Sequence, residues 1–133
     1  MAKFTMIAGT YAAGDSIPLN GTSTRCSSVY HIDGSPIIQL KGGICPSRPA
    51  VYDVDVGVTL TSLGATPEQL EIVQDGVRVI GGLISFDAAA AGEIETTSMP
   101  NEIAAVGSAR IAVEAVTAIT ITEGVVTVHR VDK

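Results

Sequence analysis

Alternation of apolar and polar residues is clearest between Val51 and Ser62. One parity of this stretch consists of Tyr52, Val54, Val56, Val58 and Leu60, and the other of Asp53, Asp55, Gly57, Thr59 and Thr61. A period of two predicts a strand with one buried face and one face in contact with water. A strand of this length with a single buried face is typical of a two-layer β structure.

Two runs rich in β-branched residues flank Asp75-Gly76 and predict a tight hairpin over residues 70–81. The Asp-Gly dipeptide readily supplies the two residues with positive φ that a type I′ turn needs. A helix is the local competitor at residues 66–69, where Thr66 fits an N-cap and Pro67 a first helical position. The turn at Asp75 leaves little room for a helix, so we expect a strand over residues 70–74.

The remaining apolar runs are short and are separated by glycine, proline and asparagine. Before Val51, we expect a first strand over residues 2–9, an exposed loop over 20–25, and a hairpin of residues 29–32 with 37–40. After the Asp75-Gly76 hairpin, further strands are expected at residues 83–86, 93–97, 109–115, 119–122 and 125–131. Residues 87–92 predict a connecting turn, Met99-Pro100-Asn101 a strand end, and Glu123-Gly124 a tight turn.

These patterns predict an all-β protein of about eight to ten strands, with no substantial helix. No internal period is present, which argues against a repeat architecture. Connections that are rich in glycine and of middling length favour a two-sheet antiparallel jelly-roll sandwich. We divide the chain into residues 1–27, an N-terminal strand and loop segment that is a candidate anchoring arm, and residues 28–133, the β jelly-roll domain.

Composition narrows the functions that this sandwich can have. The 133 residues are 46% hydrophobic but only 4% aromatic and 17% charged, so the core must be aliphatic and the weakly charged surface favours an oligomer. The net charge is −6, and the basic residues are scattered singly, which disfavours nucleic-acid binding. No apolar stretch approaches the length of a membrane span or a signal-peptide core, so we expect no membrane contact and synthesis in the cytoplasm.

Four segments resemble one known group of proteins. They are residues 50–56 (Ala-Val-Tyr-Asp-Val-Asp-Val), the block from Leu70 to Gly82, the alanine-rich turn before Ile94, and the ending from Val113 to Val131. They are similar to the small trimeric jelly rolls of the tumour-necrosis-factor (TNF) and C1q-like type, as found among bacteriophage capsid decoration or head-fibre proteins and spore-surface glycoproteins. Ala50 departs from the glycine usual in that group, and residues 1–27 match no part of it.

The resemblance implies a homotrimer whose subunits pack sheet edges around a three-fold axis. The chain has no collagen-like tract, which argues against a spore-surface fibre. The expectation is therefore a virion protein that is made in the bacterial host cytoplasm and contacts the major capsid protein or another virion protein.

The cysteines and histidines give little indication of a catalytic or metal-binding site. Cys26 and Cys45 lack metal-ligand spacing, and two independent thiols are favoured over a disulfide or a metal role. His31 and His129 have no nucleophile motif near them and are interpreted as ordinary strand-face histidines. The alternative is that three copies of either histidine bind a divalent metal on a trimer axis.

The paired carboxylates and the paired glycines are also interpreted as structural features without a chemical role. Asp53 with Asp55, and Glu93 with Glu95, share a strand face but lack the further oxygen ligands that calcium needs, so a solvated outer face is favoured. The pairs Gly42-Gly43 and Gly81-Gly82 are not followed by the Lys-Ser/Thr of a phosphate loop and are expected in turns or bulges. We therefore predict no catalytic, cofactor-binding or metal-binding residue, and no enzyme.

The leading hypothesis is a non-enzymatic, homotrimeric virion structural protein that decorates or stabilises a phage capsid or forms a fibre head. The alternative is a carbohydrate- or receptor-binding β-sandwich module. The aromatic residues available for sugar stacking are Phe4, Tyr11, Tyr30, Tyr52 and Phe86. A cupin-like enzyme is disfavoured because it needs a cluster of histidines.

Overall fold

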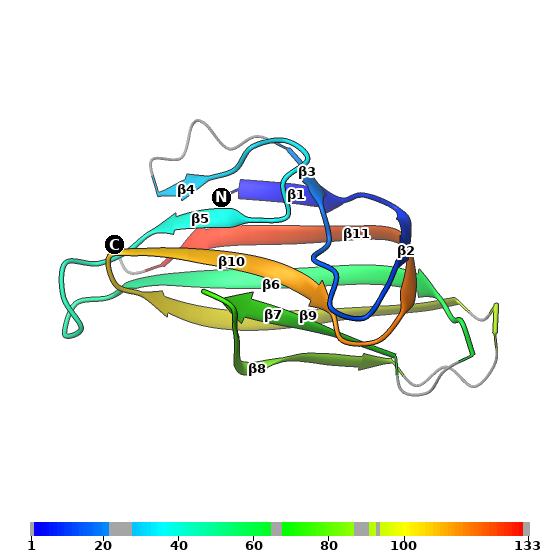
Figure 1. Ribbon diagram of the computed structural model, residues 1–133. Helices are drawn as coiled ribbons and strands as arrows, with labels where there is room; N and C mark the ends of the chain where they lie inside the picture. The colour runs from blue at the N-terminus through cyan, green and yellow to red at the C-terminus, as the bar shows by residue number, and fades with distance from the viewer. Residues whose placement is uncertain (1, 22–27, 65–67, 87–90, 93, 132–133) are drawn as a thin grey trace.

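The protein is a sandwich of two antiparallel β-sheets (Figure 1). The computed structural model describes residues 2–21, 28–64, 68–86, 91–92 and 94–131. The strands are Ala2–Met6 (β1), Gly9–Tyr11 (β2), Leu19–Asn20 (β3), Val29–Tyr30 (β4), Ile38–Lys41 (β5), Ala50–Thr61 (β6), Glu68–Gln74 (β7), Val77–Phe86 (β8), Ile94–Ala105 (β9), Ser108–Ala115 (β10) and Ile119–Arg130 (β11). No helix forms in these ranges, so none there could span a membrane.

The larger sheet has the strand order β3-β1-β11-β6-β9, with β2 also paired to β11. The smaller sheet has the order β4-β5-β10-β7-β8, so that β4 and β8 are its edges and lie at opposite sides of the molecule in Figure 1. Neighbouring strands in both sheets are antiparallel. The predicted all-β jelly-roll sandwich without substantial helix is therefore confirmed.

The core lies between the sheets and is mostly aliphatic, as the composition requires. Strand β6 supplies its longest row, since Tyr52, Val54, Val56, Val58 and Leu60 are all buried. The residues between them are partly or fully exposed on the outer face of the larger sheet. The predicted alternation from Val51 to Ser62 is confirmed along the whole strand.

Both predicted hairpins form. Asp75 and Gly76 have φ values of 52° and 85°, the two positive angles of a type I′ turn, and they connect β7 to β8. Strand β4 pairs with β5 as predicted, but the connection covers residues 31–37 and is longer than the four residues expected, because β4 ends at Tyr30 and β5 begins at Ile38. Local turn chemistry was therefore a correct guide at both sites.

Two predicted interruptions are wrong, because both strands continue. Strand β9 runs through Pro100, which pairs with Asp55 of β6. Proline is tolerated there because β9 is an edge strand, where one side of the backbone has no partner strand. Strand β11 runs through Glu123 and Gly124 as a bulge, marked by a register shift against β6 between Ile121 and Glu123.

The N-terminal residues contribute directly to the larger sheet. Strand β1 lies between β3 and β11, and its partners on β11 run from Val125 to Val128. The predicted first strand is shorter than expected, since it ends at Met6 and β2 begins at Gly9. The domain boundary predicted at residue 27 and most of the predicted 20–25 loop and 87–92 turn lie outside the described residues. The anchoring role of residues 1–27 stays a prediction.

Candidate functional site

His31 is a core residue and not the strand-face histidine that we predicted. It follows β4, is 1% exposed, and packs against the Phe4 ring with centroids 4.7 Å apart. Its Nδ1 contacts the Gly21 carbonyl oxygen, and its Nε2 lies 2.7 Å from the Ser35 carbonyl oxygen. Both ring nitrogens are therefore occupied, so a metal on a trimer axis has no free ligand atom at His31.

His129 matches its prediction, because it is exposed on the outer face of β11. It lies opposite Asp53 on β6, and Asp53 lies opposite Glu102 on β9. Among the described side chains, no group of three His, Cys, Asp or Glu is placed to hold a metal ion. Asp55 is exposed and Asp53 half-buried, consistent with the predicted solvated face, whereas Glu93 and the side chain of Glu95 lie outside the described part.

Cys45 lies in the connection between β5 and β6, where its Sγ is 3.1 Å from the Ser47 hydroxyl oxygen. That hydrogen bond lowers the pKa of the Cys45 thiol. Cys26 lies outside the described residues, so the prediction of independent thiols stays a prediction. A lone thiol with one hydroxyl partner does not form a catalytic site by itself.

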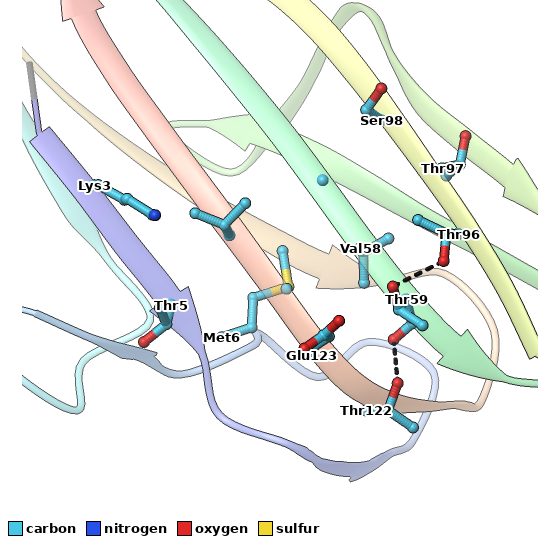
Figure 2. Close-up of a pocket in the computed structure, with 13 residues that line it drawn as sticks. Lys3, Thr5, Met6, Val58, Thr59, Thr96, Thr97, Ser98, Thr122 and Glu123 are labelled. Carbon is cyan, nitrogen blue, oxygen red and sulfur yellow. Dashed lines mark hydrogen bonds between the residues drawn. The ribbon is translucent and has the colours of Figure 1, made fainter.

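A trough of about 590 Å³ crosses the outer face of the larger sheet (Figure 2). We call it the threonine trough. Lys3 and Thr5 on β1 face Thr96 and Ser98 on β9 across it. The strand register places Val125 of β11 between Thr5 and the β6 strand. Lys3 and Glu123 are the charged residues of its lining, which is otherwise made of hydroxyl, small and apolar groups.

Two glycines make this face hollow. Gly57 on β6 and Gly124 in the β11 bulge have no side chains, so the lining beside them is backbone and the Met6 side chain. A Cβ at Gly124 would lie 2.5 Å from Met6 Sδ, so Met6 occupies the space that a side chain there would need. A Cβ at Gly57 would meet Val125 Cγ1 at 3.6 Å, an ordinary contact.

Hydroxyl groups line one end of the trough and bond to one another or to the backbone. The Thr59 and Thr96 hydroxyl oxygens are 2.9 Å apart, and the Thr122 hydroxyl donates to the Thr59 carbonyl oxygen at 3.0 Å (dashed in Figure 2). This arrangement offers hydrogen bonds and van der Waals contact to a group bound in the trough.

A second unusual surface is the edge strand β8. Glu71 of β7 pairs with Leu83 of β8, and Val73 pairs with Arg78. Between these pairs, the four residues 79–82 of β8 lie opposite the single residue Ile72 and form a large bulge. We call residues 79–82 the β8 knob. Ile80 at its tip is 100% exposed, and Val77 beside it is 70% exposed.

Sequence reasoning missed both surfaces. The available signal was the order Val77-Arg78-Val79-Ile80-Gly81-Gly82, which breaks the alternation of a strand and ends in two glycines. We predicted Gly81-Gly82 in a turn or bulge, which is confirmed, but the exposure of Ile80 was not expected. The trough could not be found locally, because its lining comes from four strands that are distant in sequence.

The outer face of the smaller sheet carries another hollow, of about 620 Å³, over β10. Its floor includes Val73 and Ala112, and its charged groups are Asp75, Arg110 and Glu114. The Asp75 carboxylate accepts a hydrogen bond from the Arg110 backbone N–H at 3.0 Å. The hairpin tip is therefore fixed onto β10 and serves the fold.

The aromatic residues offer little surface for sugar stacking. Phe4, Tyr52 and Phe86 are buried in the core, and Tyr11 is partly buried, which raises the pKa of its hydroxyl. Tyr30 is 52% exposed on the edge strand β4. Of the predicted stacking candidates, Tyr30 is the one with a largely accessible ring.

Comparison with solved structures identifies the fold. Murine APRIL at pH 5.0 aligns with a TM-score of 0.61 at 8% identity, over 95% of this chain and 98% of that one. Rabbit GITRL gives 0.56 at 8% identity over 98% and 96%, and the globular domain of zebrafish complement 1qA gives 0.52 at 8% over 97% and 96%. The fold is thus the TNF/C1q-like jelly roll expected from the sequence.

These identities are low, so the likeness concerns the fold alone. No protein-family model matches the chain, and the search of curated proteins found no significant match.

Proposed function

We propose that this chain is a non-enzymatic structural protein that works as a homotrimer of jelly rolls, decorating or stabilising a phage capsid or forming a fibre head. The observation that carries the proposal is the exposed apolar edge of β8, formed by Val77, Ile80 and Leu83. A long edge strand with exposed apolar side chains favours association, because water contact with such a surface is unfavourable. A partner chain on this edge removes that contact.

Composition and resemblance support the oligomer. Charged residues make up 17% of the chain, which is low for a surface that is in contact with water on all sides. The trimer and the virion setting come from the resemblance of residues 50–56 and 70–82 to phage decoration and head-fibre proteins. A major capsid or portal gene beside the gene for this chain would support the virion setting, and a neighbourhood of metabolic enzymes would argue against it.

The surroundings of His31 support a structural role for this histidine. Its ring is buried, and its ring nitrogens contact backbone carbonyl oxygens. General acid–base catalysis needs a titrating group that can reach a bound substrate, which a buried ring does not provide. The proposed mechanism is interfacial, with buried sheet edges inside the assembly and loops on its outside.

Molar mass in solution tests the trimer. At micromolar concentration, light scattering should give three times the chain mass of 13.6 kDa. Ile80→Asp should reduce this value to that of a monomer, because a buried unpaired carboxylate opposes association. Ser108→Asp adds the same charge at an exposed position of β10 and should leave the mass unchanged. A wild-type monomer would contradict the proposal.

The second candidate, a carbohydrate- or receptor-binding module, is favoured by a different observation. Tyr30 is exposed beside Ile32, which is also exposed, on the side of the molecule opposite β8. An exposed ring with an apolar neighbour is the kind of platform on which a sugar ring stacks. Binding on a glycan array that disappears in Tyr30→Ala, while the molar mass stays trimeric, would support this function, and no binding would argue against it.

A further inference from the structure

We propose that the hollow over β10, on the outer face of the smaller sheet, binds a sugar that carries a carboxylate group, such as a uronic or sialic acid. We call it the β10 hollow. Its volume of about 620 Å³ lies in the range of about 300–1,000 Å³ that is usual for small-molecule sites. The inference goes beyond the homotrimer, because the hollow lies within one chain, and it gives the second candidate function a binding site.

A small residue in the middle of β10 makes the hollow. Arg110, Ala112 and Glu114 lie at alternate positions of the strand and share its outer face, with the short Ala112 between two long side chains. Ala112 pairs with Val73 on β7, and Ile37, just before β5, lines the hollow on the other side. Ile37 is 42% exposed and supplies apolar surface on which the C–H face of a sugar ring can pack.

Arg110 supplies the positive group of the hollow. It is exposed, and within the part of the chain that the structure describes no carboxylate lies at ion-pair distance from its guanidinium. In contrast, Arg78 on the same sheet pairs with Glu71 at 2.8 Å. An arginine in this state can bind a ligand carboxylate through two parallel N–H···O bonds.

The hairpin tip fixes the backbone that carries this guanidinium. The Asp75 carboxylate accepts a hydrogen bond from the Arg110 backbone N–H at 3.0 Å, and the Asp75 N–H donates to the Arg110 carbonyl oxygen at 2.8 Å. Asp75 is therefore engaged with the Arg110 backbone and leaves the side chain to a ligand. A binding group on a fixed strand backbone loses less conformational freedom when the ligand binds.

The opposite wall offers acceptors for sugar hydroxyl groups. Glu114 is half-buried, and its Oε2 accepts a hydrogen bond from the Ser16 hydroxyl at 3.4 Å. Ser16 is held there because the next residue, Ile17, donates its N–H to the Val113 carbonyl oxygen at 2.8 Å. A carboxylate has about four acceptor sites, so Glu114 can also accept from a ligand hydroxyl. The hollow thus binds a carboxylate at one end and hydroxyls at the other, which orients the sugar.

The strand register extends this site to the edge strand β4. Arg110 pairs with Gln39 on β5, and Gln39 pairs with Tyr30 on β4. Residues directly opposite each other on one sheet face have Cβ atoms about 5 Å apart, so these three side chains form a row. Tyr30 is 52% exposed, and a second sugar unit can stack on its ring. A glycan of two or three units can therefore contact Arg110 and Tyr30 together.

Isothermal titration calorimetry of the full chain tests the site with two acidic probes. Trigalacturonic acid presents uronic acid carboxylates, and sialyllactose presents a sialic acid carboxylate. The matched neutral probes are the methyl ester of trigalacturonic acid and lactose. At least one acidic probe should bind, and its neutral counterpart should bind at least about tenfold more weakly, because it lacks the charged partner of Arg110. The probe that binds identifies the source of the carboxylate. No binding of either acidic probe, or equal binding of the neutral ones, would overturn the inference.

Two substitutions at Arg110 test the role of its forked guanidinium. Arg110→Gln should abolish binding of the acidic probe, and Arg110→Lys, which keeps the charge but not the fork, should bind it weakly. Arg48→Gln removes the same charge from the connection between β5 and β6, outside the lining of the hollow, and should leave the affinity unchanged. Equal losses in Arg110→Gln and Arg48→Gln would indicate an effect of net charge alone and would contradict the inference.

Raising the floor is a second test that leaves Arg110 in place. Ala112→Val puts a larger side chain in the middle of the hollow, and β-branched residues suit strands, so the chain should fold and lose binding. Ala104→Val makes the same change at an exposed position of β9 in the other sheet and should bind normally. The melting temperature of each variant verifies that it is folded. Unchanged affinity in a folded Ala112→Val chain would contradict the inference.

Light scattering on the same samples separates this inference from the proposed homotrimer. A trimeric mass without binding of an acidic probe would overturn the sugar site and leave the homotrimer standing. A monomer that binds the probe through Arg110 would contradict the homotrimer and leave the sugar site standing.

Discussion

Strands β6 and β8 are both rich in aliphatic residues, yet the fold uses them in opposite ways. Strand β6 is central in its sheet, pairs along its whole length with β9, and buries every second side chain. Strand β8 is an edge, loses its register halfway, and exposes Val77 and Ile80. Regular alternation thus specifies the core, whereas an apolar residue that breaks the alternation marks a surface with another role.

Truncating an aliphatic side chain in each strand should give the largest difference in the free energy of unfolding. Leu60→Ala on β6 removes a fully buried side chain and should lower the free energy of unfolding by about 2–5 kcal/mol. Ile80→Ala on β8 should change it by less than about 0.5 kcal/mol, because the Ile80 side chain is fully exposed. Urea unfolding at one low protein concentration measures both. Equal losses would show that β8 is a core strand.

Glycine substitutions in the two strands should differ in their effect on the free energy of unfolding by a smaller amount. Gly82→Ala on β8 places a Cβ 2.6 Å from Val79 Cγ2 and 3.0 Å from the Ile72 carbonyl oxygen, and should cost about 1–3 kcal/mol. Gly57→Ala on β6 places a Cβ in ordinary contact with Val125 Cγ1 at 3.6 Å and should be neutral or stabilising. Thermal unfolding of the two variants shows whether each substitution lowers or raises the melting temperature. A tolerated Gly82→Ala would mean that the knob does not need its bulge.

Substitutions in the hairpin turn before β8 should lower the stability by a smaller amount. Gly76 has φ of 85°, so Gly76→Ala forces an L-residue into the left-handed region and should cost about 1–2 kcal/mol. Asp75→Asn keeps a residue type that tolerates this region and should cost less. The melting temperatures of the two variants compare these costs. Equal losses would indicate that the Asp75 contact with β10 outweighs turn strain.

The sequence allowed the elements with local causes to be predicted. The alternation of β6 and the Asp75-Gly76 turn depend on residues that are neighbours in the chain, so their prediction was correct. Pro100 and Glu123-Gly124 were assigned as interruptions because local rules cannot distinguish an edge strand or a bulge from a strand end. Position within a sheet is a property of the whole fold.

The candidate surfaces were missed for the same reason. The threonine trough needs Gly57 and Gly124, from different strands, to lie side by side. The burial of His31 depends on the carbonyl oxygens of Gly21 and Ser35, in two different loops. In contrast, the aliphatic core and the low surface charge followed from composition alone, because they do not depend on which strands are adjacent.

The most direct test of the central claim, that β8 is an assembly edge, is the dependence of melting temperature on protein concentration. Association stabilises the folded state by mass action, so the melting temperature of the wild-type chain should rise with concentration. The melting temperature of Ile80→Asp should be independent of concentration and should equal the wild-type value at high dilution. A wild-type melting temperature that does not change with concentration, and that matches Ile80→Asp throughout, would contradict the account.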